Sequence, residues 1–273
     1  ELGGISVKGT TGQRRTGNLP PRIAETPSGM LNSVGLQNPG IDHFIAEELP
    51  YLKTKDTVVI ANIAGSTAEE YAEIARKLDS TDVDMLSAAG VDMIEVNISC
   101  PNVKAGGAAF GVSCDGAAHI TKIVRQATSK PVMMKLSPNV TSIADIAKAC
   151  EAEGADAVSL INTLLGMRID IRTGRPILHN NVGGLSGPAV FPVAVRMVWQ
   201  VANAVKIPVC GMGGVSSWED AVEIMMAGAS VVQVGAAIFN DPMVPVKINE
   251  GLADYCAEKN IMLKDIIGSV KPW

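Results

Sequence analysis

The chain has 273 residues, of which 47% are hydrophobic and 19% charged, so it can bury the core of one barrel-sized domain or two small ones. Its net charge of −5 argues against nucleic acid as a partner, and no apolar run reaches the length of a membrane-spanning helix. The five cysteines lack CxxC and CxxH spacing, which argues against a zinc ribbon or an iron–sulfur cluster in this chain and is typical of a reducing cytoplasm.

Seven short apolar runs, separated by segments with helical periodicity, predict strands joined by helices. The predicted strands are Ile5–Val7, Val58–Ala61, Met93–Val96, Val132–Met134, Ala157–Ile161, Val209–Gly211 and Val231–Val234. Three helices end in a glycine suited to cap them, at Gly90, Gly154 and Gly228. This alternation predicts an α/β protein with a parallel sheet, and the length fits a single (β/α)8 TIM barrel over residues 1–273.

The strand count leaves this barrel one strand short. The segment Thr11–Gly40 is too rich in proline and glycine to hold a central strand. We therefore expect that the first strand of the barrel is missing from this chain. The strands that begin at Ile5 and Val231 would then have unpaired edges, which invite aggregation.

A long segment, residues 11–56, separates the first two predicted strands. It exceeds the length of a plain connection, and segments of that kind tend to be functional. Its centre, Met30–Asn38, combines amide side chains with a glycine whose backbone can approach a ligand closely. We expect this insertion to form a loop that covers a substrate.

Serines mark the expected starts of three helices. Ser66 and Glu69 have the Ser-x-x-Glu spacing of a capping box. Ser142 and Ser217 are each followed by an aspartate three residues later, in the first turn, where a negative charge complements the helix dipole. These serines predict helices that begin directly after them.

Polar residues follow several predicted strands, and in a parallel barrel these carboxyl ends meet at the face that holds the active site. Asn62, Asn97 and Asn162 would offer donors and acceptors to a flat ligand with amide edges. Lys8 and Lys135 also follow strands, where a cation can stabilise developing negative charge. The alternative for each lysine is an ion pair with a neighbouring strand-end carboxylate.

Cys100 lies just after the strand that ends near Asn97 and begins a glycine-containing stretch, which predicts an active-site loop over residues 101–114. A thiol on such a loop can act as a nucleophile or general base. The alternative is that an unpaired cysteine is a small buried hydrophobe, which is our interpretation of Cys150 and Cys210.

Glycines follow the last two predicted strands, in Gly211-Met-Gly-Gly214 and at Gly235-Ala236. Barrels commonly bind phosphate with these two loops, because backbone N–H groups point at the anion where side chains are small. The alternative is that the glycines only serve tight turns. His43, His119 and His179 show no ligand spacing, so no metal site is predicted, and Trp199 and Trp218 are interpreted as packing residues.

Five segments together resemble the dihydroorotate dehydrogenases. They are Asn97-Ile-Ser-Cys-Pro-Asn-Val-Lys-Ala-Gly-Gly107, Lys135-Leu-Ser-Pro-Asn139, Ile161-Asn-Thr-Leu164, Gly183-Gly-Leu-Ser-Gly187 and Gly211-Met-Gly-Gly214. The resemblance extends over the whole chain. A cysteine at position 100 resembles the class 1 soluble enzymes, and the stretches after it, including Ala109-Phe-Gly111, resemble the NAD-linked 1B subtype.

The resemblance implies a set of site residues. FMN would be held by Lys8, Gly9, Asn62, Asn97, Lys135, Ile161, Gly187, Gly213, Gly214, Gly235 and Ala236. Dihydroorotate would be held by Lys8, Asn32, Ser33, Val34, Gly35, Leu36, Asn97, Asn162 and Thr163, with Cys100 as the base. A first strand whose end touches the flavin is the part of the family pattern that this chain lacks.

The implied activity is the oxidation of dihydroorotate to orotate in pyrimidine (UMP) biosynthesis. Electrons would pass from FMN to a separate subunit that carries FAD and a 2Fe–2S cluster, and then to NAD, with a homodimer of this chain inside a heterotetramer. Two alternatives remain open: a related FMN barrel such as a dihydropyrimidine dehydrogenase, and a binding subunit without catalysis.

Overall fold

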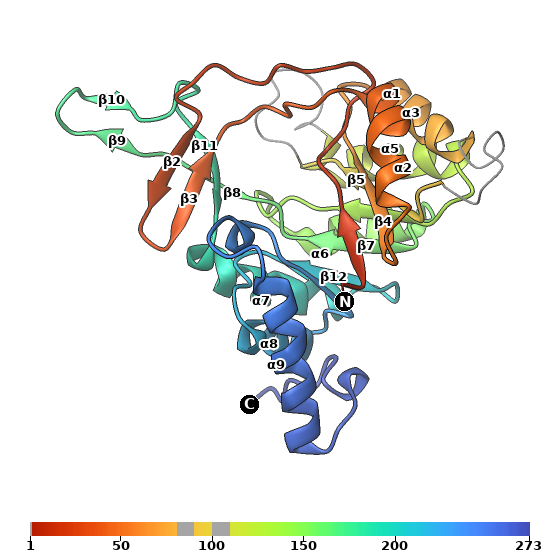
Figure 1. Ribbon diagram of the computed structural model, residues 1–273, viewed down its shortest axis with the longest axis vertical. Coiled ribbons are helices and arrows are strands. Elements are labelled where there is room, and N and C mark those ends of the chain that lie inside the picture. Colours follow the sequence, from red (N-terminus) through yellow and green to blue (C-terminus); the bar gives the residue numbers. More distant parts are fainter. Residues whose placement is uncertain (1, 81–89, 100–109) are drawn as a thin grey trace.

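A computed structural model of the chain describes residues 2–80, 90–99 and 110–273. Its main element is a curled parallel sheet of seven strands in the order β1-β4-β5-β6-β7-β12-β13 (Figure 1). These strands are β1 (Gly4–Ser6), β4 (Val58–Ile63), β5 (Met93–Asn97), β6 (Val132–Lys135), β7 (Ala157–Leu160), β12 (Val209–Met212) and β13 (Val231–Gln233). The seven predicted strands and their parallel arrangement are confirmed.

The central strands are buried on both faces, because helices cover one face and the curl of the sheet encloses the other. Every residue of β7 and β12 is buried, as is usual for parallel sheets. The edge strands differ, with Ile5 of β1 38% exposed and Val231 of β13 57% exposed. Within the described residues, β1 pairs with β4 and β13 pairs with β12, and neither has a second partner.

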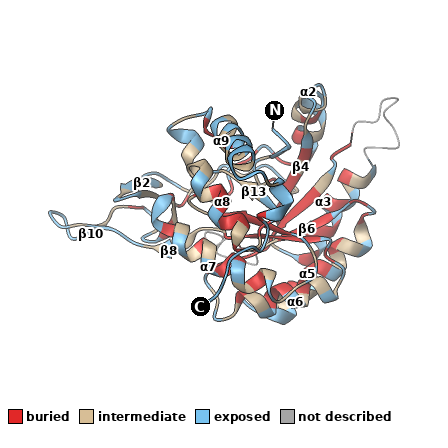
Figure 2. Cartoon of the chain, turned by 90° about the horizontal axis from the view of Figure 1, so that it is seen from below, coloured by how far each residue is buried: buried red, intermediate tan, exposed pale blue. Residues whose placement is uncertain are grey.

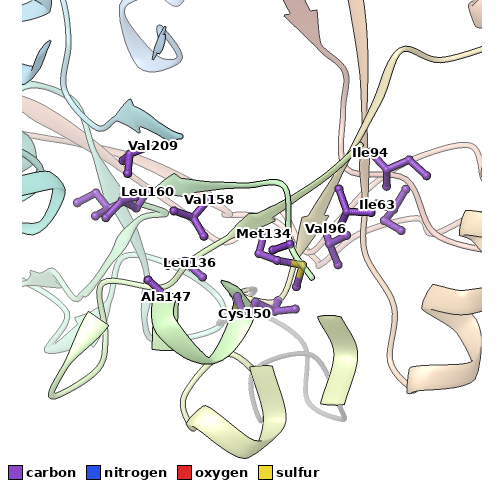
Figure 3. Close-up of a cluster of buried hydrophobic side chains, with 14 of the residues drawn as sticks. Ile63, Ile94, Val96, Met134, Leu136, Ala147, Cys150, Val158, Leu160 and Val209 are labelled. Carbon is purple, nitrogen blue, oxygen red and sulfur yellow. The ribbon is translucent and has the colours of Figure 1, made fainter. Parts of the chain in front are cut away.

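Five amphipathic helices pack on the outer face of this sheet. They are α3 (Ala68–Ser80), α5 (Cys114–Ala127), α6 (Ile143–Ala152), α7 (Phe191–Ala202) and α8 (Trp218–Met226). Figure 3 shows the resulting core, in which Ala147 and Cys150 of α6 lie against strand residues such as Met134 and Val158. In Figure 2 the buried residues accordingly gather on the central strands and the adjoining helix faces.

The expected caps are confirmed at two helices and displaced at a third. The hydroxyls of Ser142 and Ser217 accept hydrogen bonds from the third residue of α6 and α8. At α3 the predicted cap Ser66 is wrong by one residue, because it is Thr67 whose hydroxyl accepts from the Glu70 N–H at 3.2 Å. The Glu70 carboxylate in turn accepts from the Ser66 N–H at 2.7 Å, so Glu69 has no part in the cap.

A second, antiparallel sheet of four strands stands beside the carboxyl ends of the main sheet, in the order β2-β3-β11-β8. Its strands are β2 (Ile23–Thr26), β3 (Gly29–Asn32), β8 (Leu164–Gly166) and β11 (Gly183–Ser186), and the β9 (Ile169–Asp170) and β10 (Arg175–Pro176) hairpin projects from it (Figure 1). Residues 11–56 are therefore more than a loop: they hold the β2–β3 hairpin and the helical turns α1 (Ile41–His43), η1 (Phe44–Glu48) and α2 (Leu49–Leu52).

The remaining helical segments are η2 (Pro188–Val190), η3 (Ala236–Phe239), α9 (Val244–Lys259) and η4 (Leu263–Asp265). The ring of Trp218 at the start of α8 packs against Tyr255 of α9, with 5.8 Å between centroids, as expected for a packing residue. Among the described helices, none combines the length and apolar character needed to cross a bilayer.

Candidate active site

The parallel register brings the predicted polar residues to adjacent positions at the carboxyl ends of the strands. Asn97, the last residue of β5, is paired with Lys135, the last residue of β6. Asn62 of β4 is paired with Glu95 of β5, and Lys135 is paired with Ser159 of β7. Since side chains alternate across a strand, Asn62, Glu95, Asn97 and Lys135 all face the interior of the curled sheet.

Glu95 is the centre of this polar group. Its side chain is 0% exposed. One carboxylate oxygen, Oε2, accepts hydrogen bonds from the Ser6 hydroxyl at 3.1 Å and from the Asn62 amide, and lies 3.9 Å from Lys135 Nζ. The other, Oε1, accepts from the Ser159 hydroxyl at 2.8 Å. The carboxylate therefore connects strands β1, β4, β6 and β7.

Glu95 is held in its charged form despite its burial. Burial alone would raise the pKa of this carboxyl. The Lys135 ammonium and the hydrogen bonds from Asn62, Ser159 and Ser6 outweigh burial and lower the pKa below its usual value. For Lys135, an ion pair and a place in the site were set out as alternatives, and the structure combines an ion pair with a strand-end position.

The hydrogen bonds of the three predicted asparagines fix how their amides are turned. Asn62 donates through Nδ2 to Glu95, and its Oδ1 lies 2.8 Å from where a Cβ on Gly9 would stand, so the oxygen faces the end of β1. Asn97 accepts through Oδ1 from the Ser99 N–H and hydroxyl, at 3.1 and 2.9 Å. Asn162 donates through Nδ2 to Ser99 and accepts through Oδ1 from the Thr163 N–H.

The glycines after β12 form a tight surface beside the end of β7. Gly213 and Gly214 have φ values of +123° and +84°, which favour glycine. A Cβ on Gly213 would stand 2.9 Å from Ile161 Cγ1, and one on Gly214 would stand 2.7 Å from the Gly187 carbonyl oxygen. Gly213 is thus in contact with Ile161, and Gly214 with Gly187. Gly235 and Ala236 follow β13, the neighbour of β12 in the sheet.

The predicted substrate segment, residues 32–36, runs from β3 toward the end of β1. Leu36 Cδ2 lies 3.4 Å from the Cβ position of Gly9, which places the segment beside Asn62. Ser33 is completely buried, and its hydroxyl has no hydrogen-bond partner among the described residues. Val34 and Gly35 lie between these two residues, with Gly35 at φ +77°. Asn32 Nδ2 approaches the Gly184 carbonyl at 3.4 Å, and Thr163 Oγ1 packs against Gly184 from the other side.

The structure gives less detail for two of the predicted site elements, Lys8 and the active-site loop that follows Cys100. Lys8 follows β1 with an exposed side chain. Cys100 and residues 101–109 of the predicted active-site loop lie outside the described residues, and only the two flanks of the loop are seen. Ser99 is held by Asn97 and Asn162, and Phe110 packs edge-on against Tyr71, whose hydroxyl donates to the Asn97 carbonyl at 2.7 Å.

Glu95 and Ser99 are polar residues of this face that the sequence analysis missed. Glu95 falls in the middle of the run Met93–Val96, which was interpreted only as an apolar strand. A charged residue within such a run is a usable signal, because a buried carboxylate needs partners. Ser99 carried no comparable signal, since its importance depends on the asparagines of two different strands.

Similarity to known proteins covers nearly the whole chain. The family model described as Dihydroorotate dehydrogenase matches residues 1–255. A Parabacteroides distasonis protein named "Dihydroorotate dehydrogenase B (NAD(+)), catalytic subunit" is 55% identical over 270 residues, which are 98% of this chain and 86% of that protein. Proteins of the same name from Bacteroides thetaiotaomicron and Geotalea daltonii are both 53% identical, covering 99% of this chain and 87% of each relative.

Proposed function

Because this chain belongs to the dihydroorotate dehydrogenase family of oxidoreductases, we propose that it oxidises dihydroorotate to orotate in pyrimidine biosynthesis. The observation that carries the proposal is the group of strand-end side chains Asn62, Asn97 and Lys135 around buried Glu95, beside the glycines that follow β12. The resemblance to the NAD-linked 1B subtype agrees with the names of the relatives at 53% to 55% identity.

FMN is the cofactor that this face fits. Gly213 and Gly214 follow β12, leave no room for a Cβ and have backbone conformations that favour glycine. Loops after the last strands of such barrels commonly bind phosphate through backbone N–H groups. Asn62 turns an acceptor oxygen toward the face, and Lys135 brings a cation to the neighbouring strand end. Lys8, Gly9, Asn97, Ile161, Gly187, Gly235 and Ala236 would complete the cofactor site. When bound, FMN supplies a two-electron acceptor for the hydride that leaves C6 of dihydroorotate.

The residues of the chain itself would hold the substrate and move its proton. Residues 32–36, Asn97, Asn162 and Thr163 would bind dihydroorotate. The Ser33 hydroxyl, which has no hydrogen-bond partner among the described residues, would donate to the substrate. Cys100 Sγ would remove the proton from C5, and the segments 11–56 and 101–114 would cover the substrate and exclude water. Lys135 would stabilise the negative charge that develops in the transition state.

Electrons would leave through a partner. The words "catalytic subunit" and "NAD(+)" in the relatives' names support a separate electron-transfer subunit that passes electrons to NAD. From the resemblance described above, we expect that subunit to carry FAD and a 2Fe–2S cluster. The exposed apolar stripe Leu165, Met167, Ile169 and Ile171 supports a homodimer within a heterotetramer. The unpaired thiols Cys114, Cys150, Cys210 and Cys256 are compatible with the cytoplasm.

An eighth strand would complete the barrel. Within the described residues, β1 and β13 are the two edge strands of the parallel sheet, and both have exposed apolar residues, Ile5 and Val231 among them. One further parallel strand between them would bury these side chains and close the sheet.

The function is tested by mixing the purified full-length protein anaerobically with dihydroorotate. We expect the protein to be yellow and the flavin absorption to bleach on mixing. Bleaching by dihydrouracil in preference to dihydroorotate would identify a dihydropyrimidine dehydrogenase instead. A colourless protein would indicate a binding subunit without catalysis, and a flavin that stays oxidised with both substrates would contradict the proposal.

A further inference from the structure

Glu95 is a charged residue in the buried interior of the sheet, where an ionised side chain is energetically unfavourable without partners. Its carboxylate lies inside the curled sheet with no exposed surface. Removing an ion from water is unfavourable unless partners with good geometry compensate for the lost hydration. Its partners come from four strands, through Ser6, Asn62, Lys135 and Ser159. The mechanism above gives Glu95 no direct contact with substrate.

The first effect of Glu95 is on the Asn62 amide. An amide has a donor end and an acceptor end, and either can face a ligand. Because the Glu95 carboxylate is ionised and only accepts, it binds Nδ2 of Asn62 and leaves Oδ1 toward Gly9. At the carboxyl end of β4, Asn62 therefore presents its Oδ1 as a hydrogen-bond acceptor, which suits an N–H group of a ligand.

The second effect is on the Lys135 ammonium. Lys135 Nζ lies 3.9 Å from Glu95 Oε2. The lysine side chain is 19% exposed, whereas the glutamate side chain is completely buried, so Lys135 links the buried carboxylate to the accessible carboxyl ends of the strands. A flexible lysine is restrained by such a pair, and the charge of Glu95 offsets part of the field that Lys135 would exert on a ligand.

We propose that Glu95 is a positioning residue, which sets Asn62 as an acceptor and Lys135 as a partly neutralised cation toward the flavin ring system. This inference rests on the proposed function in taking FMN as the ligand. It assigns to Glu95 control over how strongly the flavin is held and how easily it is reduced, without contact between Glu95 and the flavin.

The test is the variant Glu95→Gln in the full-length protein. A glutamine has the same shape but removes the charge and keeps only one of the two acceptor oxygens. Its NH2 group must therefore face either Asn62 and Ser6 or Ser159, all of which donate to Glu95. We expect the Kd for FMN, measured by quenching of flavin fluorescence, to rise about tenfold or more, as for loss of a hydrogen bond to a charged group. We expect the reduction potential of the bound flavin to become more positive, because Lys135 loses the charge that offsets it.

Cys210→Ala is the matched control. Cys210 lies in the same interior, is buried and is paired in register with Ser159, but it is not one of the hydrogen-bond donors to Glu95 described above. It should lower the melting temperature while leaving the Kd and the potential at wild-type values. Glu95→Asp keeps the charge and should return the potential toward wild type.

An altered melting temperature with an unchanged Kd and potential in Glu95→Gln would overturn the proposal and make Glu95 a structural residue. If both Glu95 variants fail to fold, Ser159→Ala tests the proposal in their place. This variant removes the hydrogen-bond donor to Glu95 Oε1 and keeps the charge of Glu95. A rise of a few-fold in its Kd for FMN supports the inference, and an unchanged Kd overturns it. Failure of the proposed function is separate, since it would show in the wild-type protein as absent flavin or absent bleaching.

Discussion

Cys100 is the residue on which the proposed proton transfer depends. Replacement by alanine should leave FMN bound and slow flavin reduction by dihydroorotate about 10²–10⁴-fold, the usual contribution of a positioned acid–base group. Cys100→Ser should keep part of the activity, more at high pH, because a hydroxyl accepts a proton but ionises less readily. Stopped-flow absorbance of the flavin measures both rates.

The other thiols provide the controls for this experiment. Cys150 is buried, and burial raises its pKa to about 11, so it stays protonated near neutral pH. Cys114 is exposed at the start of α5, close in sequence to the loop, and Cys114→Ala should reduce at the wild-type rate. Equal rates in wild type and Cys100→Ala would place the base elsewhere, with Cys114 the next residue to test.

At this scale the sequence predicted which side chains stand at the strand ends, but not how their polar groups are paired. Asn62, Asn97 and Lys135 could be placed because each closes an apolar run and parallel strands end on one face. The amide orientations could not, since they depend on Glu95 and Ser99, which reach them across strands far apart in the sequence. The interpretation of Cys150 and Cys210 as buried hydrophobes is confirmed.

Among the elements, the turn after β12 is expected to contribute to both stability and cofactor binding. Gly213→Ala introduces a Cβ at φ +123°, 2.9 Å from Ile161 Cγ1, and should lower the free energy of unfolding by about 1–3 kcal/mol. Urea denaturation of the apoprotein measures this loss, which should come with weaker FMN binding.

Gly235→Ala is the matched control for Gly213→Ala. Gly235 has a φ of −118°, and among the described residues no atom lies within 4 Å of its Cβ position. Stability should stay near the wild-type value while FMN binds more weakly, because the added methyl would stand where a phosphate is expected. Equal stability losses at the two positions would mean that both glycines serve only their turns.

Element boundaries show what local patterns can predict. The strand runs were located to within a few residues, but β4 and β12 extend to Ile63 and Met212, so Asn62 lies inside a strand and not after it. The cap of α3 was displaced from Ser66 to Thr67 because both residues satisfy the simple pattern, and only the geometry of Glu70 decides between them.

For the whole molecule, β1 and β13 each pair on one side only within the described residues, which predicts marginal stability of the 273-residue chain alone. Unpaired apolar edges favour aggregation, so we expect weak FMN binding and a tendency to associate. An N-terminal extension that supplies one further parallel strand should raise the flavin content and the melting temperature. Size-exclusion chromatography, flavin absorbance and thermal scans would show this. A chain of the printed length that is monodisperse, yellow and equally heat-stable would show that the edges are satisfied in another way.

The second sheet is the part of the fold that the sequence could not predict. Its strands are short, and β3 pairs with β11, whose glycines and small residues carry no strand pattern. The segment Thr11–Gly40 was correctly excluded from the main sheet, but its β2–β3 hairpin was expected as a loop. A pairing this distant depends on the folded main sheet, which brings β3 and β11 together, and not on local preference.

The pairing of β3 with β11 also means that β3 is synthesised well before the strand it pairs with. Asn32 and Gly184, which face each other across β3 and β11, are separated by 152 residues. At a translation rate of ~5–20 residues per second, the hairpin waits roughly 8–30 s for its partner strand. During that interval β3 has no β11 partner, so we expect Leu31, which is only 2% exposed in the folded chain, to be uncovered. The ribosome-bound protein thus passes through a stage in which a holding chaperone has a defined segment to shield.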